Sequence, residues 1–189
     1  MTLPATDRER RFAEVYAAQR ARVFAYALRR VHTLEEAEDV VADTFLVAWR
    51  RLEAMPGTGA LTWLLGVARR VIADRQRAEA RRDALAQKVQ EDAPMQIGTE
   101  DQEQPVSTEA ELALCGLARL SENDREVLLL VAWDDLSHRQ AAAVLGCNMA
   151  TFTVRFHRAR KRLAEAMKEE SGGERGFHER ALASKDMTP

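Results

Sequence analysis

The stretch from Leu136 to Arg162 most constrains what this chain can fold into. Ser137 and Gln140, three residues apart, are typical of a capping box at a helix N-terminus. The helix they begin is predicted to end before residues 146–148, because Gly and Asn tolerate a left-handed turn. A second helix is predicted over about residues 150–167. Two helices joined by a three-residue turn are typical of a helix-turn-helix.

The second of these helices has two contrasting faces at 100° per residue. Its apolar stripe consists of Phe152, Phe156, Ala159, Leu163 and Met167. The rest of its surface carries the candidate DNA-contacting residues Ala150, Thr151, Thr153, Val154, Arg155, His157, Arg158 and Lys161. A basic run is often only a solvated face. Here the turn glycine, the small Ala142 in the first helix and the apolar stripe agree in register, so we interpret the second helix as a DNA reader.

The composition limits the remaining function classes. The chain has 189 residues and a formal net charge of −2, so affinity for nucleic acid has to come from segregated charge. No apolar run approaches the ~20 residues that span a bilayer, and the N-terminus does not resemble a signal peptide. We therefore expect a cytoplasmic protein without membrane insertion. Cys115 and Cys147 lack metal-ligand spacing, and no catalytic arrangement is evident, so neither a metal, a cofactor nor an enzyme is predicted.

The N-terminal third is predicted to hold two amphipathic helices. The first covers about residues 7–31, and Thr33 with Glu36 forms a capping box for the second. The second helix begins with four acidic residues and ends with Arg50. This acidic start suits the helix dipole, and it equally suits docking to a basic partner. The residues of this helix leave both interpretations open.

A loop at residues 55–59 precedes a helix over about residues 60–82. One side of this helix is apolar, and the other side carries Trp63, Gly66, Arg70, Asp74, Arg77 and Arg81. Arginines neutralise phosphate and an aromatic ring stacks on an unpaired base, as single-stranded DNA requires. Alternatively, Trp63 covers the core and the arginines are solvated. The helix alone does not decide between these interpretations.

The character of the chain changes at residue 89. The stretch 89–107 is acidic, contains Pro and Gly, and has no Lys or Arg, so we interpret it as a flexible linker. Residues 7–88 and 108–170 are then two small helical domains, and 171–189 a flexible tail. Within the second domain, helices are predicted from Thr108 and after Ser121, ahead of the helix-turn-helix. The predicted fold class is all-α.

Three ordered motifs resemble bacterial sigma factors of the extracytoplasmic-function (ECF) group. Residues 36–50 resemble that family's segment for binding core polymerase, and residues 62–74 its promoter-melting helix. Residues 120–130 and 136–163 are similar to its fourth region. The resemblance covers about residues 10 to 168, which leaves only the tail outside it.

The resemblance implies partners and roles. Core RNA polymerase would be bound by Glu36, Asp39, Asp43, Phe45 and Trp49. The minus-ten element of promoter DNA would be held by Trp63, Arg69, Arg70, Asp74, Arg77 and Arg81, and the minus-thirty-five element by the eight residues named above. The linker would follow the RNA-exit path. Because the family is commonly held silent by an anti-sigma protein, such a protein is a further expected partner.

The sequence departs from the family pattern at two sites. Arg70 stands where Asn is common, and Thr153-Val154 where Lys or Arg followed by Ser is usual. A hydroxyl and an isopropyl group can touch a thymine methyl but cannot make arginine's bidentate contact with guanine. We therefore expect DNA shape and phosphate contacts to contribute to reading the minus-thirty-five element.

Two other function classes compete with the sigma-factor interpretation. A stand-alone helix-turn-helix regulator would bind duplex DNA without polymerase. A pure protein-interaction module would neither bind duplex DNA nor support initiation. Only a sigma factor supports promoter-specific initiation by core polymerase.

Overall fold

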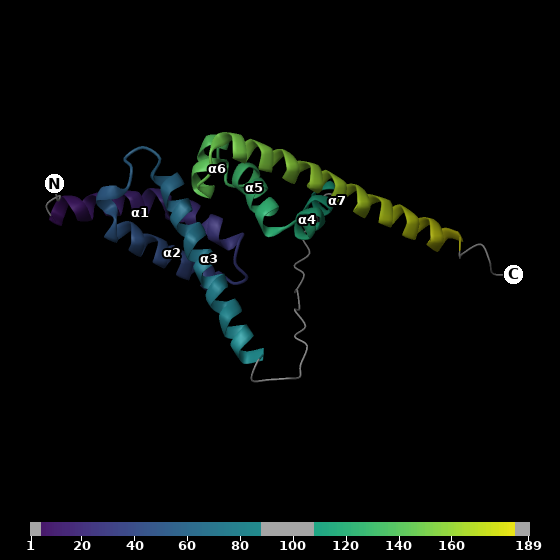
Figure 1. Ribbon diagram of the computed structural model, residues 1–189, viewed down its shortest axis with the longest axis horizontal. Helices are drawn as coiled ribbons and strands as arrows, with labels where there is room; N and C mark the ends of the chain where they lie inside the picture. Colours follow the sequence, from purple (N-terminus) through teal and green to yellow (C-terminus); the bar gives the residue numbers. More distant parts are fainter. Residues whose placement is uncertain (1–4, 88–107, 184–189) are drawn as a thin grey trace. The chain divides into compact units, whose positions relative to one another are not determined.

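A computed structural model describes residues 5–87 and 108–183, and every regular element in these ranges is helical (Figure 1). The elements are α1 (Ala5–Leu28), α2 (Leu34–Arg50), η1 (Leu52–Ala54), α3 (Ala60–Gln87), α4 (Thr108–Arg119), α5 (Glu122–Ala132), α6 (His138–Leu145) and α7 (Met149–Ala183). The all-α prediction is confirmed. The predicted linker 89–107 lies outside the described residues.

The chain forms two compact units. The first contains α1, α2, η1 and α3 and also takes in residues 139–148, whereas the second contains α4, α5 and α7. The predicted domain 108–170 instead keeps α6 with its neighbours in sequence. This eight-residue helix is the element that the two divisions place differently.

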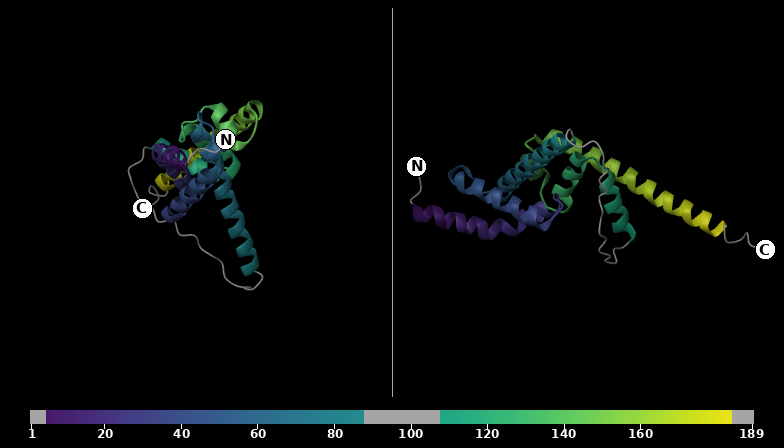
Figure 2. Two further views of the ribbon diagram at one scale, coloured as in Figure 1. Left: turned by 90° about the vertical axis from the view of Figure 1, so that its left-hand side faces the viewer. Right: turned by 90° about the horizontal axis from the view of Figure 1, so that it is seen from below.

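In the first unit α1, α2 and α3 pack against one another, and α1 and α2 run side by side (Figure 2). Its largest buried side chains come from all three helices and from η1, and include Val23, Tyr26, Val40, Leu52, Leu64 and Leu65. The start of α2 is fixed as predicted: the Thr33 hydroxyl accepts from the Glu36 N–H at 3.1 Å, and the Glu36 carboxylate accepts from the Thr33 N–H at 3.2 Å.

Two arginines attach α1 to the end of α2 and to the loop beyond it. Arg8 donates to the Trp49 carbonyl at 2.8 Å, and Arg11 donates to the Met55 carbonyl at 2.9 Å. Phe12 lies edge-on to Trp49, with ring centroids 5.2 Å apart. These contacts satisfy carbonyls that the ends of helical segments leave without intrahelical donors.

In the second unit α7 packs against α4 and α5. Gly116 allows a close approach, because a Cβ at this position would lie 3.0 Å from side-chain atoms of Leu163 and Met167. Arg125 donates to the carbonyls of Leu117 (3.0 Å) and Ala118 (2.8 Å) at the end of α4. At the start of α5, the Ser121 hydroxyl accepts from the Asp124 N–H at 3.2 Å, so Ser121 is the N-cap of this helix.

The turn between α6 and α7 has the geometry of a Schellman motif. Gly146 adopts a φ of +66°, and its N–H donates to the Ala143 carbonyl at 3.2 Å. The Cys147 N–H donates to the Ala142 carbonyl at 3.0 Å. These two bonds, together with a left-handed residue just after the helix, are the defining features of this ending. The predicted break at residues 146–148 is confirmed.

The predicted flexible tail 171–189 overlaps the far end of α7, and its residues 184–189 lie outside the described residues. The helix continues through Gly172 and Gly173 to Ala183. Extending an existing helix costs much less than nucleating a new one. The residues after the glycines are mostly good helix formers, among them Glu174, Arg175 and Ala181.

Replacing Gly146 by Ala should lower the free energy of unfolding by about 1–2 kcal/mol, because a left-handed conformation costs an L-residue that much. No atom lies within 4 Å of the added methyl, so the loss would be conformational rather than steric. Gly57→Ala is the matched control, since Gly57 also has open space and its φ is not positive. Chemical denaturation measures both changes, and equal stabilities of the two variants would contradict this account of the turn.

Candidate functional site

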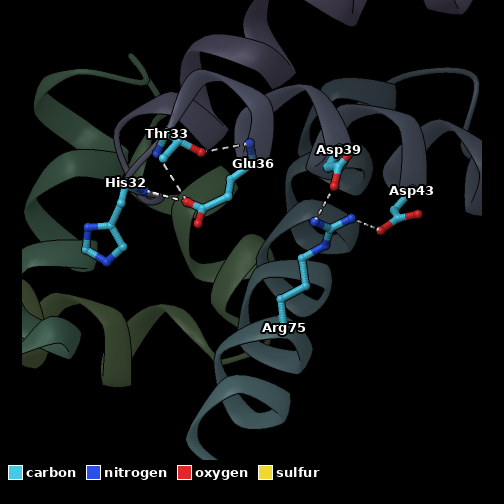
Figure 3. Close-up of polar contacts among 6 residues, drawn as sticks. All are labelled: His32, Thr33, Glu36, Asp39, Asp43 and Arg75. Atoms are coloured by element: carbon cyan, nitrogen blue, oxygen red, sulfur yellow. Dashed lines mark hydrogen bonds and ion pairs between the residues drawn. The ribbon is translucent and has the colours of Figure 1, made fainter. Parts of the chain in front are cut away.

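Asp39 and Asp43 lie one turn apart on α2, and both contact Arg75 of α3 (Figure 3). One terminal nitrogen of the guanidinium lies 3.0 Å from Asp39 Oδ2, and the other lies 2.5 Å from Asp43 Oδ2. The carboxylates remain accessible, with 60% of the Asp39 side chain and 47% of the Asp43 side chain exposed. Hydrogen bonding to Asp43, and then to Asp39, raises the pKa of the Arg75 guanidinium above its ordinary value.

Arg75 was not among the predicted site residues, although the sequence holds a signal for it. Leu64, Ala68 and Ile72 form the buried stripe of α3, and position 75 continues that stripe at helical spacing. A charged residue on an otherwise buried stripe needs a partner to offset its desolvation. The two carboxylates of α2 are that partner.

The other predicted polymerase-binding residues lie in different surroundings. Glu36 caps α2, and its carboxylate also accepts from the His32 N–H at 2.8 Å (Figure 3). Phe45 is only 3% exposed and contacts Tyr16, with ring centroids 4.7 Å apart. Trp49 is half-buried, with the Arg8 guanidinium 4.6 Å from its ring. The ring of Phe45 is thus covered by α1, and its contact with core polymerase stays a prediction.

The exposed surface of α2 includes residues that the sequence reasoning did not select. They are Glu35, Glu38, Ala42 and Leu46, of which Leu46 is 47% exposed. Leu46 follows Asp39 by seven residues and Asp43 by three, so it shares their side of the helix. This spacing is the sequence signal that identifies Leu46 as a neighbour of the two carboxylates. An exposed leucine beside two carboxylates is a mixed apolar and acidic surface.

On α3 the predicted DNA-facing residues divide by burial. Trp63 and Arg69 are half-buried, whereas Arg70, Asp74, Arg77 and Arg81 are exposed. Asp74 and Arg77 form an ion pair with each other. Arg70 and Arg81 share this side of the helix. The Asp74–Arg77 pair between them has no net charge.

On α7 the predicted separation of faces is present. Phe152 and Ala159 are fully buried, and Phe156 and Leu163 are half-buried. The predicted DNA-contacting residues are exposed apart from Thr151, which is half-buried. His138, the first residue of α6, lies against the two phenylalanine rings, with centroids 5.3 and 4.8 Å away.

Two details define the chemistry of the exposed face of α7. The Thr153 hydroxyl donates to the Met149 carbonyl at 2.9 Å, and 50% of Val154 is exposed. The first turns of α7 therefore present alkyl groups. Residues 149–164 contain five Lys or Arg and no Asp or Glu, so the following turns are strongly basic. Arg162 differs from the other basic residues of this range because it forms an ion pair with Asp124, at 2.5 Å.

Within the described ranges no three His, Cys, Asp or Glu side chains are grouped as metal ligands would be. None of the helices described there is long and apolar enough to cross a bilayer.

Family models match both units. The model described as sigma-70 region 2 matches residues 15–82, and the model described as sigma-70, region 4 matches residues 110–163. The ECF RNA polymerase sigma factor SigL of Mycobacterium tuberculosis is 32% identical over 161 residues, which cover 82% of this chain and 88% of SigL. The chain belongs to the ECF RNA polymerase sigma factors.

Other comparisons agree with this membership. EcfG of Rhodopseudomonas palustris, also an ECF sigma factor, is 30% identical over 74% of this chain and 76% of its own. The sigma factor RpoE of Bartonella quintana, solved in complex with the anti-sigma factor NepR, has a TM-score of 0.58. It is 25% identical, and the match covers 87% of this chain and 98% of RpoE. CnrH, solved with the cytosolic domain of CnrY, shares the fold at a TM-score of 0.56 and 23% identity.

Membership decides between the function classes that the sequence left in competition. This ECF sigma factor binds core RNA polymerase and directs promoter-specific initiation of transcription. A stand-alone regulator would not need the region 2 unit, which makes up the N-terminal part of the chain.

Proposed function

We propose that three exposed surfaces divide the work of this sigma factor in the cytoplasm. The carboxylate face of α2 docks core polymerase, the arginine face of α3 holds the minus-ten element, and the exposed face of α7 reads the minus-thirty-five element. The observation that carries the proposal is the segregation of charge in a chain with a net charge of only −2. Acidic groups collect on α2 and cations on α7.

The docking surface comprises Asp39, Asp43 and Leu46 of α2. Their exposure and the lack of a basic side chain between Leu34 and Val47 favour a cationic partner segment. Complementary charges at such an interface increase the association rate and select the partner. Glu36 and Trp49 flank this surface, and they also support it through the helix cap and the contact with α1.

The minus-ten surface comprises Arg70, Arg77 and Arg81, with Trp63 and Arg69 at its N-terminal end. Guanidinium groups spaced along one side of a helix match the charge of a DNA strand. The half-buried Trp63 keeps part of its ring available for an unstacked base. Asp74 restrains Arg77 through their ion pair, so its contribution is to position that arginine.

The minus-thirty-five surface combines two kinds of readout. Residues near the N-terminus of a recognition helix reach base edges, and here those residues are Ala150, Thr153 and Val154. They offer methyl groups, and their natural counterpart in the major groove is the C5-methyl of thymine. Arg155, His157, Arg158 and Lys161 follow, where they reach phosphates and the next bases.

Replacing thymine by uracil in the minus-thirty-five element should weaken promoter binding by the holoenzyme about fourfold per contacted methyl, the value of one buried methyl group. In a Val154→Ala protein the same replacement should have little further effect, because the partner of the methyl is already gone. Titration of a promoter selected by the holoenzyme measures both losses. Thymines in the spacer serve as the control, and additive losses at the Val154 site would contradict the contact.

An anti-sigma protein is a further proposed partner. Support comes from RpoE of Bartonella quintana, which was solved with an anti-sigma factor and matches most of this chain. Exposed apolar residues on α1 and α2, such as Leu28 and Leu34, give such a protein surface to cover. A protein of this kind would prevent the chain from joining core polymerase when added in excess.

Initiation by purified chain and core polymerase tests the division of work as a whole. Transcripts should start only at promoters that the holoenzyme protects in both the minus-ten and minus-thirty-five regions. Cleavage reagents attached to single cysteines on α3 and α7 should cut at the minus-ten and minus-thirty-five elements respectively. Cutting in the opposite order, or at one element only, would contradict the assignment of surfaces.

A further inference from the structure

We infer that Arg75 is a positioning residue for polymerase docking. Its guanidinium holds the carboxylates of Asp39 and Asp43 as a fixed pair of ligands for cationic side chains on core polymerase. The inference rests on the proposed docking role of α2. It adds a residue from α3, a helix otherwise assigned to DNA.

The geometry of the cluster supports this role. Arg75 reaches both carboxylates at once, with N–O distances of 3.0 Å and 2.5 Å. Both contacts use the Oδ2 atom, so the guanidinium does not engage the Oδ1 atom of either carboxylate (Figure 3). Without a cation between them, two aspartates at i and i+4 repel each other. The planar fork of arginine fits such a bridging position, whereas a lysine ammonium provides only a point charge.

Burial also separates the roles within the cluster. Only 33% of the Arg75 side chain is exposed, against 60% for Asp39 and 47% for Asp43. The cation thus lies deeper than the two anions, and a partner meets carboxylates first. One cation against two anions leaves the cluster with a net charge of −1. The surface therefore stays attractive to a basic segment after Arg75 has ordered it.

A simple brace between α2 and α3 would not require this arrangement. Both helices already bury apolar residues in the core of the unit, including Val40 and Val41 of α2 and Leu64 and Leu65 of α3. Ion pairs this exposed contribute little to stability. Removing Arg75 should therefore leave the unit folded while releasing the two carboxylates to rotate.

The spacing of the carboxylates specifies the chemistry of the partner. Side chains at i and i+4 have Cβ atoms about 5–6 Å apart. Two cationic side chains separated by a similar distance, as on one face of a partner helix, would meet both carboxylates together. Such a contact is short-ranged and charged, so its association rate should fall as salt is added.

The test measures association and dissociation of core polymerase with the full-length Arg75→Gln protein, without DNA. Loss of a positive charge should leave association equal or faster at low salt. Dissociation should become about threefold to tenfold faster, because two side chains now have to be ordered on binding. Arg75→Lys should recover only part of the lost residence time. Arg82→Gln is the matched control, since Arg82 is an exposed arginine of the same helix and belongs to none of the proposed surfaces.

Three results would overturn the inference. Tighter binding by Arg75→Gln would show that Arg75 competes with the polymerase for the carboxylates. A lower melting temperature with unchanged dissociation of the folded protein would show that it is only a brace. Equal kinetics for Arg75→Gln and Arg82→Gln would show no role in docking. Asp39→Arg separates the two proposals: if it also binds normally, the docking surface itself is wrong.

Discussion

Reversing the charge of Asp39 is expected to weaken the capture of core polymerase by at least about thirtyfold, which corresponds to about 2 kcal/mol. Two effects act together in Asp39→Arg. The new guanidinium repels the cationic partner segment, and it lies one turn from Asp43, close enough to neutralise that carboxylate as well. Binding of core polymerase to immobilised protein measures the loss, and circular dichroism with thermal melting shows whether the variant is folded.

The matched control for Asp39→Arg is Glu14→Arg, a charge reversal at an exposed position of α1. It changes the net charge by the same amount without altering the carboxylate face of α2. If folded Asp39→Arg captures polymerase as well as Glu14→Arg does, α2 does not dock through its carboxylates.

Phe45→Ala cannot serve as a docking test. Because the ring is buried against α1, its removal should cost about 3–5 kcal/mol of stability. Any loss of polymerase binding would then report unfolding of the first unit. Leu46→Ala is the informative apolar variant, since Leu46 is exposed on the same helix.

Helix boundaries could be predicted where a residue satisfies backbone groups locally. Thr33 and Ser121 cap the helices that follow them, and Gly146 ends α6 in a left-handed conformation. These signals depend on neighbours within a few residues, so a single sequence contains them. The two faces of α7 could be predicted equally well, because periodicity shows which side of a helix is apolar.

The burial of a side chain by a neighbouring helix could not be predicted from local sequence signals. The apolar stripe of α2 includes Phe45, but only the structure shows that the rings of α1 cover it. A helical wheel shows which residues share a side, but it does not show which neighbour covers them. The ion pairs of Arg75 could not be predicted either, because its carboxylate partners are more than thirty residues away in the sequence. Contacts over such distances depend on the packing of whole helices.

Replacing Arg158 by Ala should cost about 1–3 kcal/mol of promoter binding by the holoenzyme, about 5- to 150-fold, if the side chain reaches a base edge. Arg158 is exposed two turns into α7, beyond the methyl-bearing residues at its start. A base contact should be lost only on promoters that carry the preferred base. The measurement is therefore a titration of the variant holoenzyme against minus-thirty-five elements altered one base pair at a time, at several salt concentrations.

Arg162→Ala is the matched control for Arg158→Ala, because it removes the same charge from the same helix. Arg162 is paired with Asp124 in α5, so its loss should lower stability slightly and leave base preference unchanged. A loss for Arg158→Ala that is uniform across sequences, with a shallower salt dependence, would assign the side chain to a phosphate instead. Unchanged binding at every salt concentration would remove Arg158 from the DNA surface, and the reading of the element would then rest on the first turns of α7.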